Sequence, residues 1–263
     1  MAWFDSGINL FSEQFADDRE QVIARSKSAG IDKHLLIASD LAECQQNLHW
    51  CQQHSDSYTT AGVHPHQAGQ VEANWLQQLQ SILTEYPIVA VGECGLDFNR
   101  NFSSQDAQVD VFTKQLQLAK ALQLPVYLHE RDAFDTQLQL LKDHAICHGI
   151  AHCFTGDTTQ LKAYLDLGLY IGITGWLCDE RRNQTLVEAL SYLPLDRICL
   201  ETDAPFLLPR NLSPKPKSRR NEPAYLIAIA SQLAQLKAIP LQQVETQCWQ
   251  NSLTLFHLGR SVQ

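Results

Sequence analysis

Short apolar runs alternate with amphipathic stretches along most of this 263-residue chain. The first run begins at Trp3, and seven more lie at residues 34–39, 58–63, 88–92, 125–128, 149–153, 169–174 and 197–202. The runs are apolar on both faces, which is typical of parallel strands buried between other elements. The stretches between them, such as 104–123, have helical spacing. Eight strands in alternation with helices predict an α/β protein with a (β/α)8 TIM barrel.

A doubly wound open sheet would produce the same alternation of strands and helices. Many such sheets carry the dinucleotide-binding pattern Gly-x-Gly-x-x-Gly after the first strand, and this chain does not. Its length also matches one α/β barrel of about 250 residues. We therefore expect a single barrel domain over residues 1–263.

Eight cysteines are present without a Cys-x-x-Cys pair. A chain of this length needs no disulfides to fold, so we expect reduced thiols in a cytoplasmic protein. The start of the chain lacks the basic and apolar regions of a signal peptide. No apolar run approaches the roughly 20 residues that a membrane span requires, so we expect no membrane association.

Four of the apolar runs lead into a residue that can bind a metal, namely Glu93, His129, His152 and Asp203. Burying a carboxylate or an imidazole at a strand end is costly without partners. In a barrel the carboxyl ends of all strands meet on one rim, so these side chains would converge there. Mixed imidazole and carboxylate ligands suit zinc, manganese, cobalt or nickel, and less obviously magnesium. The sequence therefore predicts a metal site.

The roles of individual residues stay open at this point. A single histidine at a strand end is more often a hydrogen-bonded structural residue than a ligand, but four converging strand ends are hard to explain that way. His64 and His66 follow the third run, and either ligation or a substrate contact fits them. Asp203 is either a ligand or the base that takes a proton from water.

The net charge of −9 implies that the surface as a whole repels nucleic acid. Residues 204–223 form a proline-rich segment that cannot be a regular helix and is expected to be a long loop. It carries Arg210, Lys215, Lys217, Arg219 and Arg220. This run is either a solvated face or, together with Arg100, a clamp for substrate phosphates, which we favour. Phe98 and Trp176 are either core residues or stacking surfaces for bases.

Several motifs resemble those of the TatD family of metal-dependent deoxyribonucleases, and they occur in the family's order over nearly the whole chain. The main ones are Gly62-Val63-His64-Pro65-His66, Gly92-Glu93-Cys94-Gly95-Leu96-Asp97, His152-Cys153-Phe154-Thr155-Gly156 and Glu201-Thr202-Asp203-Ala204-Pro205. The resemblance implies a TIM-barrel hydrolase of the metal-dependent type that cuts DNA with Mg²⁺, with Mn²⁺ or Zn²⁺ as alternatives. It further implies 3′–5′ exonuclease action on single strands, with RNA as a second candidate substrate, and a part in DNA repair.

The resemblance also implies roles for the site residues. Glu93, His129 and His152 would be metal ligands, Asp203 the catalytic or metal-binding aspartate, and His64 a catalytic residue near the scissile phosphate. The residues expected to contact substrate phosphates are Arg100, Arg210, Arg219, Arg220, His66 and Asn9. We expect DNA as the partner and a monomer.

One departure from the family pattern concerns the first strand. Many members have Asp-x-His-x-His there, whereas this chain has Gly7 and Asn9 at the two histidine positions. Glycine cannot ligate, and asparagine offers only a neutral amide oxygen. We therefore expect one firm metal site and a weak second one.

An amide or ester hydrolase of the amidohydrolase type, such as an aminoacyl-tRNA deacylase, is the main alternative because the same metal chemistry serves both bonds. Those barrels commonly use a first-strand His-x-His and a carboxylated lysine. This chain lacks the first, and its fifth run leads to His129 instead of lysine. A non-catalytic binding protein is a third interpretation, but it would not need the histidines and carboxylates to be kept together.

Overall fold

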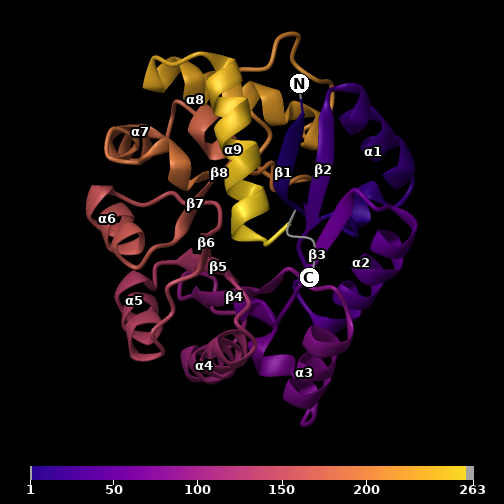
Figure 1. Ribbon diagram of the computed structural model, residues 1–263, viewed down its shortest axis with the longest axis vertical. Helices are drawn as coiled ribbons and strands as arrows, with labels where there is room; N and C mark the ends of the chain where they lie inside the picture. The colour runs from indigo at the N-terminus through magenta and orange to yellow at the C-terminus, as the bar shows by residue number, and fades with distance from the viewer. Residues whose placement is uncertain (1, 259–263) are drawn as a thin grey trace. The chain divides into compact units, whose positions relative to one another are not determined.

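The computed structural model describes residues 2–258, and it divides into two compact units. Unit 1 comprises the described residues of Met1–Leu36, Cys153–Lys162 and Ile171–Gln263, and unit 2 comprises Ile37–His152 and Ala163–Tyr170. The strands are β1 (Trp3–Ile8), β2 (Ile31–Leu36), β3 (Ser57–Ala61), β4 (Ala90–Asp97), β5 (Val126–Arg131), β6 (Gly149–Ala151), β7 (Tyr170–Ile173) and β8 (Ile198–Leu200) (Figure 1). The order of the strands in the sheet follows the chain from β1 to β8.

Helices separate the strands. They are α1 (Arg19–Ser28), α2 (Leu41–Gln53), α3 (Trp75–Glu85), α4 (Gln105–Leu122), α5 (Phe134–Asp143), α6 (Thr158–Asp166), α7 (Gln184–Leu190), α8 (Leu226–Lys237) and α9 (Leu241–Leu255). Short 3₁₀ helices are η1 (Glu13–Phe15), η2 (Pro65–Gln70), η3 (Gly175–Cys178), η4 (Leu195–Arg197) and η5 (Pro223–Tyr225). Each apolar run predicted as a strand overlaps one of these strands, with shifted ends.

In unit 2, strands β3 to β6 pair in parallel, and helix α4 packs on β4. The helical spacing predicted for 104–123 is confirmed, and Phe112, Leu116 and Ala119 are buried on one face of α4, whereas Val109 is only half-buried. Val111 is buried instead of Val109. The helix begins after Ser104, whose side chain accepts a hydrogen bond from the Ala107 amide and so caps the first turn.

Strand β4 is longer than predicted, and this difference matters because Glu93 lies inside the strand instead of beyond its end. The sequence pattern missed the extension because glycines and a carboxylate interrupt the apolar run. Gly95 has a φ of 139°, and a Cβ there would lie 1.9 Å from the main-chain oxygen of His129. Only glycine therefore allows β5 to come this close at the level of the site residues.

In unit 1, β1 pairs with β2 and β7 pairs with β8, both in parallel, and an isolated bridge joins Ile8 to Ala204. Helix α9 packs on β1 and β8. Its buried Asn251 donates to the carbonyl oxygens of Leu195 and Ile198, 2.8 Å away in each case. These bonds fix the start of β8, the strand that precedes Asp203.

The segment 204–222 contains no helix or strand, which confirms the predicted loop. Arg220 anchors its end on η1 and α1, where its guanidinium donates to the carboxylate of Asp18 and to the carbonyl oxygen of Gln14. Arg25 and Arg220 both pair with Glu222 as well.

A second anchor of the loop is the buried Asn221. Its side-chain amide donates to Thr202 O at 2.9 Å, and its main-chain amide donates to Pro205 O at 3.0 Å. The turn around Asp203 is therefore held from the far end of the loop.

All eight cysteines are free thiols, as predicted. Among residues 2–258, no single helix is both long and apolar enough to cross a membrane, although the bent pair Pro223–Lys237 and Leu241–Leu255 passes that test of length and composition when taken together.

The Asn221 bonds lead to a prediction for stability. Asn221→Ala leaves the buried carbonyl of Thr202 without this donor, so it should lower the free energy of unfolding by about 1–3 kcal/mol. Denaturant unfolding followed by circular dichroism measures the change. The matched control is Asn211→Ala in the same loop, because Asn211 is exposed and donates to Ala228 O at 3.1 Å. It should cost at most about 0.5 kcal/mol. Equal losses in the two variants would contradict the anchoring role of Asn221.

Candidate metal centre

The imidazoles and carboxylates of the predicted metal site that belong to unit 2 lie on neighbouring elements. Glu93 is in β4 and His129 in β5, His152 directly follows β6, and His64 and His66 stand at the start of η2 after β3. Because these strands are parallel and adjacent, their side chains meet in one place. The structure thus brings together Glu93, His129, His152, His64 and His66.

Glu93 is the centre of this group. Its Oε1 lies 3.0 Å from His129 Nδ1, 3.6 Å from His64 Nε2 and 3.9 Å from His152 Nε2. The carboxylate is buried, with a side-chain exposure of 9%. A single oxygen atom is therefore approached by three imidazole nitrogens from three different elements.

Asp97 is a second buried carboxylate in the group, and it was not among the predicted site residues. Its Oδ2 lies 2.7 Å from His66 Nε2 and 3.3 Å from His129 Nε2. The sequence contains a signal for it, because Asp97 follows Glu93 by four residues in one strand. An even separation places both side chains on the same face. His129 thus lies between two carboxylates.

Hydrogen bonds orient two of the imidazoles. The Tyr127 hydroxyl lies 2.8 Å from His152 Nδ1, which leaves Nε2 facing Glu93. The main-chain amide of His66 donates to Nδ1 of His64 at 3.1 Å. A neutral His64 therefore carries its proton on Nε2 and is a hydrogen-bond donor on the side of Glu93. This tautomer suits donation to an oxygen better than ligation of a metal.

Buried glutamines from the helices hold the strand ends that carry these residues. Gln115 of α4 accepts from the Val63 amide at 2.8 Å and donates to the Val63 carbonyl at 3.0 Å, next to His64. Gln108 makes the same pair of bonds with the main chain of Asp97, at 2.8 and 3.0 Å. Each side chain satisfies main-chain groups that would otherwise be unpaired inside the protein.

The pKa shifts follow from burial and from these contacts. Burial alone would raise the pKa of Glu93, but the nearby imidazoles of His64, His129 and His152 hold it well below its usual range. Burial would lower the pKa of His129, yet its hydrogen bonds to Asp97 and Glu93 raise it to about 9. Burial lowers the pKa of His64 to about 3, so this ring is neutral at pH 7.

The donor set fits a divalent cation. Ligand atoms of His64, His66 and His129 all lie within 4.8 Å of one another. Because Nδ1 of His64 already accepts from the His66 amide, the other imidazoles and the carboxylates are the donors left for a cation. The carboxylates of Glu93 and Asp97 lie on either side of the His129 ring, 3.0 and 3.3 Å from its two nitrogens, and favour positive charge between them. Imidazole nitrogen together with carboxylate oxygen is the usual donor set for zinc and manganese, and magnesium prefers oxygen alone.

Asp203 belongs to unit 1, where it follows β8. Its backbone has a φ of 54°, and its Oδ1 accepts a hydrogen bond from the Asn9 side-chain amide at 2.9 Å. The predicted site residues Asn9 and Asp203 are therefore direct neighbours. The hydrogen bond from the Asn9 side chain orients the carboxylate of Asp203. The sequence alone did not indicate this role of Asn9.

The residues before Asp203 form a buried polar network. Thr202 donates to the carboxylate of Asp5 from both its amide and its hydroxyl. Burial raises the pKa of Asp5 to about 8, against these hydrogen bonds. The Glu201 carboxylate accepts from the Cys153 amide at 3.1 Å, and a Cβ on Gly172 would lie 2.5 Å from it. Glycine in β7 therefore makes room for Glu201.

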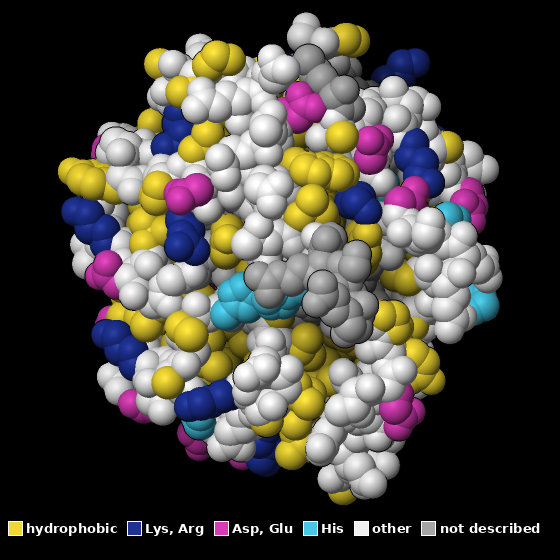
Figure 2. Space-filling view, viewed as in Figure 1, with side chains coloured by type: hydrophobic (Ala, Val, Ile, Leu, Met, Phe, Trp, Pro, Cys, Tyr) yellow, Lys and Arg dark blue, Asp and Glu magenta, His cyan; other side chains and the backbone are white. Residues whose placement is uncertain are grey.

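The arginines predicted as phosphate ligands have different surroundings. Arg220 already donates to Asp18 and Glu222, and Arg210 pairs with Asp179 and Glu180. Arg100 and Arg219 are exposed. On the face drawn in Figure 2, Lys and Arg side chains occur singly or in small groups, with Asp and Glu side chains among them. The phosphate-binding role of the four arginines stays a prediction, and the contacts of Arg220 support a structural role in the loop.

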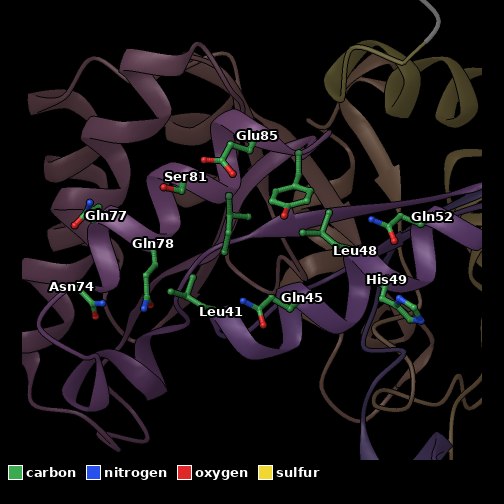
Figure 3. A pocket seen from close by; sticks show the side chains of 12 residues that line it. Leu41, Gln45, Leu48, His49, Gln52, Asn74, Gln77, Gln78, Ser81 and Glu85 are labelled. Atoms are coloured by element: carbon green, nitrogen blue, oxygen red, sulfur yellow. The ribbon is translucent and has the colours of Figure 1, made fainter.

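A groove of about 680 Å³ lies between α2 and α3, away from this chemistry (Figure 3). It is lined by Leu41, Gln45, Leu48, His49, Gln52, Asn74, Gln77, Gln78, Ser81, Ile82, Glu85 and Tyr86. The predicted site residues, all within the described part of the chain, are not among them. The groove is thus not the location of the candidate centre.

The chain is similar to known proteins over nearly its whole length. A family model described as TatD related DNase matches residues 4–257. A relative from Klebsiella pneumoniae (strain 342), named 3′-5′ ssDNA/RNA exonuclease TatD, is 47% identical over 255 residues, which are 96% of this chain and 97% of the relative. A relative of the same name from Erwinia amylovora is 46% identical and covers 97% of this chain and 100% of its own.

A solved structure shows the fold. The crystal structure of a TatD homologue from Escherichia coli K12 matches with a TM-score of 0.89 and 28% identity, over 97% of this chain and 98% of that one. Together with the strand order β1 to β8, this match confirms the predicted (β/α)8 TIM barrel. The family model covers nearly the full chain, and the curated relatives share almost half of its residues, so the chain belongs to the TatD related DNase family.

Proposed function

We propose that this protein is a metal-dependent nuclease that removes nucleotides from the 3′ end of single-stranded DNA, and also of RNA. The observation that carries the proposal is the approach of three imidazole nitrogens to Oε1 of Glu93, within 3.9 Å, in a member of the TatD family. The direction of cutting and the two substrates rest on the names of the relatives, 3′-5′ ssDNA/RNA exonuclease TatD.

Glu93, His129 and His152 are the proposed metal ligands, since they supply one carboxylate and two imidazoles from β4, from β5 and from the residue that follows β6. When bound, a divalent cation supplies Lewis-acid polarisation of a phosphoryl oxygen and makes water more acidic. The family resemblance favours Mg²⁺, whereas the imidazole-rich donor set equally suits Mn²⁺ or Zn²⁺. A second, weaker cation site remains part of the proposal because Gly7 and Asn9 replace the first-strand histidines.

His64 and Asp203 are the proposed catalytic residues. His64 donates from Nε2 to an oxygen of the scissile phosphate, because its Nδ1 is occupied by the His66 amide. Asp203 accepts the proton of the attacking water, and the Asn9 amide holds one of its oxygens in place. A monomer, a cytoplasmic location and a part in DNA repair stay predictions.

The metal requirement leads to the first prediction. Protein treated with EDTA should not shorten an end-labelled single strand, and Mg²⁺ or Mn²⁺ should restore cleavage from the 3′ end. The cleavage rate of Glu93→Gln should fall by at least about 100-fold with every metal. Loss of a residue that only hydrogen-bonds to a metal ligand typically costs about 10- to 100-fold, and loss of a ligand itself should cost more. Glu85→Gln, an exposed glutamate on α3, is the matched control and should keep its activity. Activity that persists in EDTA would contradict the proposal.

The role of Asp203 leads to a second prediction. Asp203→Asn keeps the shape of the side chain but removes the proton acceptor, so kcat should fall about 10²- to 10⁴-fold. The Kd for a single strand, measured by fluorescence anisotropy in EDTA, should change by less than about threefold, well under 1 kcal/mol. Asp196→Asn, an exposed aspartate in η4, serves as the control. Normal kcat in Asp203→Asn would remove this residue from the mechanism.

Asp97 leads to a third prediction. Asp97→Asn removes a charge beside His66 and His129, so the affinity for Mn²⁺ should fall by about 10- to 100-fold. Isothermal titration of EDTA-stripped protein measures it. The control is Asp132→Asn, since Asp132 is exposed and accepts from Asn99 at 2.7 Å without touching the imidazoles named here. Equal affinities in both variants would exclude Asp97 from the metal centre.

A further inference from the structure

Phe102 is an exposed aromatic residue beside the candidate metal centre. Its exposure of 66% is the highest among the large apolar side chains of the described residues. It lies in the connection between β4 and α4, five residues after Asp97. Single exposed apolar residues are common on proteins, so exposure alone indicates no function. What requires an explanation is that this exposed ring lies next to an imidazole of the candidate metal centre.

The ring of Phe102 contacts the imidazole of His66. Their centroids are 4.8 Å apart and their planes are inclined by 79°, so the contact is edge to face. His66 in turn bonds to Asp97 at 2.7 Å. One side chain therefore separates an apolar, solvent-exposed ring from the buried carboxylates of the centre.

The segment that carries Phe102 is firmly held. The Asp97 carboxylate accepts from the amides of Asn99 and Arg100, at 3.0 and 2.8 Å. The buried Ser103 donates to His66 O at 2.9 Å and accepts from the Gly69 amide at 2.8 Å. These bonds tie both sides of Phe102 to Asp97 and η2. The ring is thus presented to solvent from a fixed position, as a recognition surface requires.

We propose that Phe102 is the stacking platform for an unpaired nucleobase of the substrate, next to the phosphate that is cut. This inference rests on the proposed nuclease function. The imidazoles and carboxylates serve the phosphate and the cation, and the imidazole rings of His64 and His152 are buried, whereas the ring of Phe102 is exposed. Aromatic rings stack on any base, which gives binding without sequence preference.

The platform also selects single strands. A base within a duplex is already stacked and paired, so its face is not available to Phe102. Arg100, which is exposed and lies two residues before Phe102, is the predicted contact for a neighbouring phosphate. From the sequence, Phe98 and Trp176 are either core residues or stacking surfaces, and Phe102 is not indicated. The Arg182 guanidinium lies 3.7 Å from the ring centre of Trp176, and Phe98 is only partly exposed.

The test compares the wild-type enzyme with Phe102→Ala and Phe102→Trp. The substrates are an intact single strand and a series of strands that each lack one base, at a different one of the last nucleotides before the 3′ end. On the intact strand, Phe102→Ala should lower kcat/KM by roughly 5-fold or more, and tryptophan should restore it. At one abasic position the wild-type rate should fall to that of Phe102→Ala, because the base that uses the platform is missing. Tyr86→Ala, another exposed aromatic of unit 2, is the matched control and should cleave like wild type.

A second measurement reports stacking without cleavage. With 2-aminopurine at the same position and EDTA present, binding to the wild-type protein should quench the fluorescence, and Phe102→Ala should lose this quenching. A variant that slows intact and abasic strands equally would show that Phe102 only supports His66, and this would overturn the inference. Equal rates of wild type and Phe102→Ala on the intact strand would overturn it as well.

These outcomes are distinct from failure of the proposed function. If the wild-type enzyme with Mg²⁺ or Mn²⁺ cleaves no strand, the nuclease proposal is wrong. The quenching measurement then still decides whether Phe102 stacks on a base. Circular dichroism spectra of each variant confirm that the fold is retained.

Discussion

A carboxylate buried within a parallel strand is costly unless other groups compensate its charge. In this protein Glu93 is compensated by imidazoles from the segments that flank β4, and the second carboxylate, Asp97, shares one of them. The arrangement requires close approach of the main chains, which Gly95 permits, and fixed strand ends, which Gln108 and Gln115 provide. The polar residues of the helices thus support the charged residues of the strands, and both are needed for the centre to exist.

The contacts that hold the residues around Glu93 differ from those around Asp203 in how far apart their partners lie in the sequence. Around Glu93 the supports are short-range in sequence, because β3 to β6 and α4 follow one another along the chain. Around Asp203 the most distant contact is the one with Asn9, which lies in the segment after β1, 194 residues away. Asn221 at the end of the long loop bonds to Thr202 across only 19 residues. The turn around Asp203 therefore joins the two ends of unit 1, whereas the group around Glu93 is built from consecutive elements.

Much of the fold could be predicted from the sequence, because buried parallel strands produce continuous apolar runs that helices separate. Glu93, His129 and His152 could be found for the same reason, since each interrupts or ends such a run. Asp97 was missed because the glycines around it conceal the rest of β4. The pairing of Arg220 with Asp18 could not be predicted, because the partners are about 200 residues apart and a run of basic residues does not reveal which of them is neutralised.

The loop 204–222 is attached near Asn211 at one point and at Arg220 and Asn221 at another. The turn that carries Asp203 thus has its geometry set by residues on the far side of the proline-rich stretch. A substitution, insertion or deletion between these anchors can change which molecules the loop contacts. It need not change the position of Asp203. The stability of the turn around Asp203 and the composition of the loop are thus separate properties of this segment, because the bonds that fix the turn are made at the end of the loop.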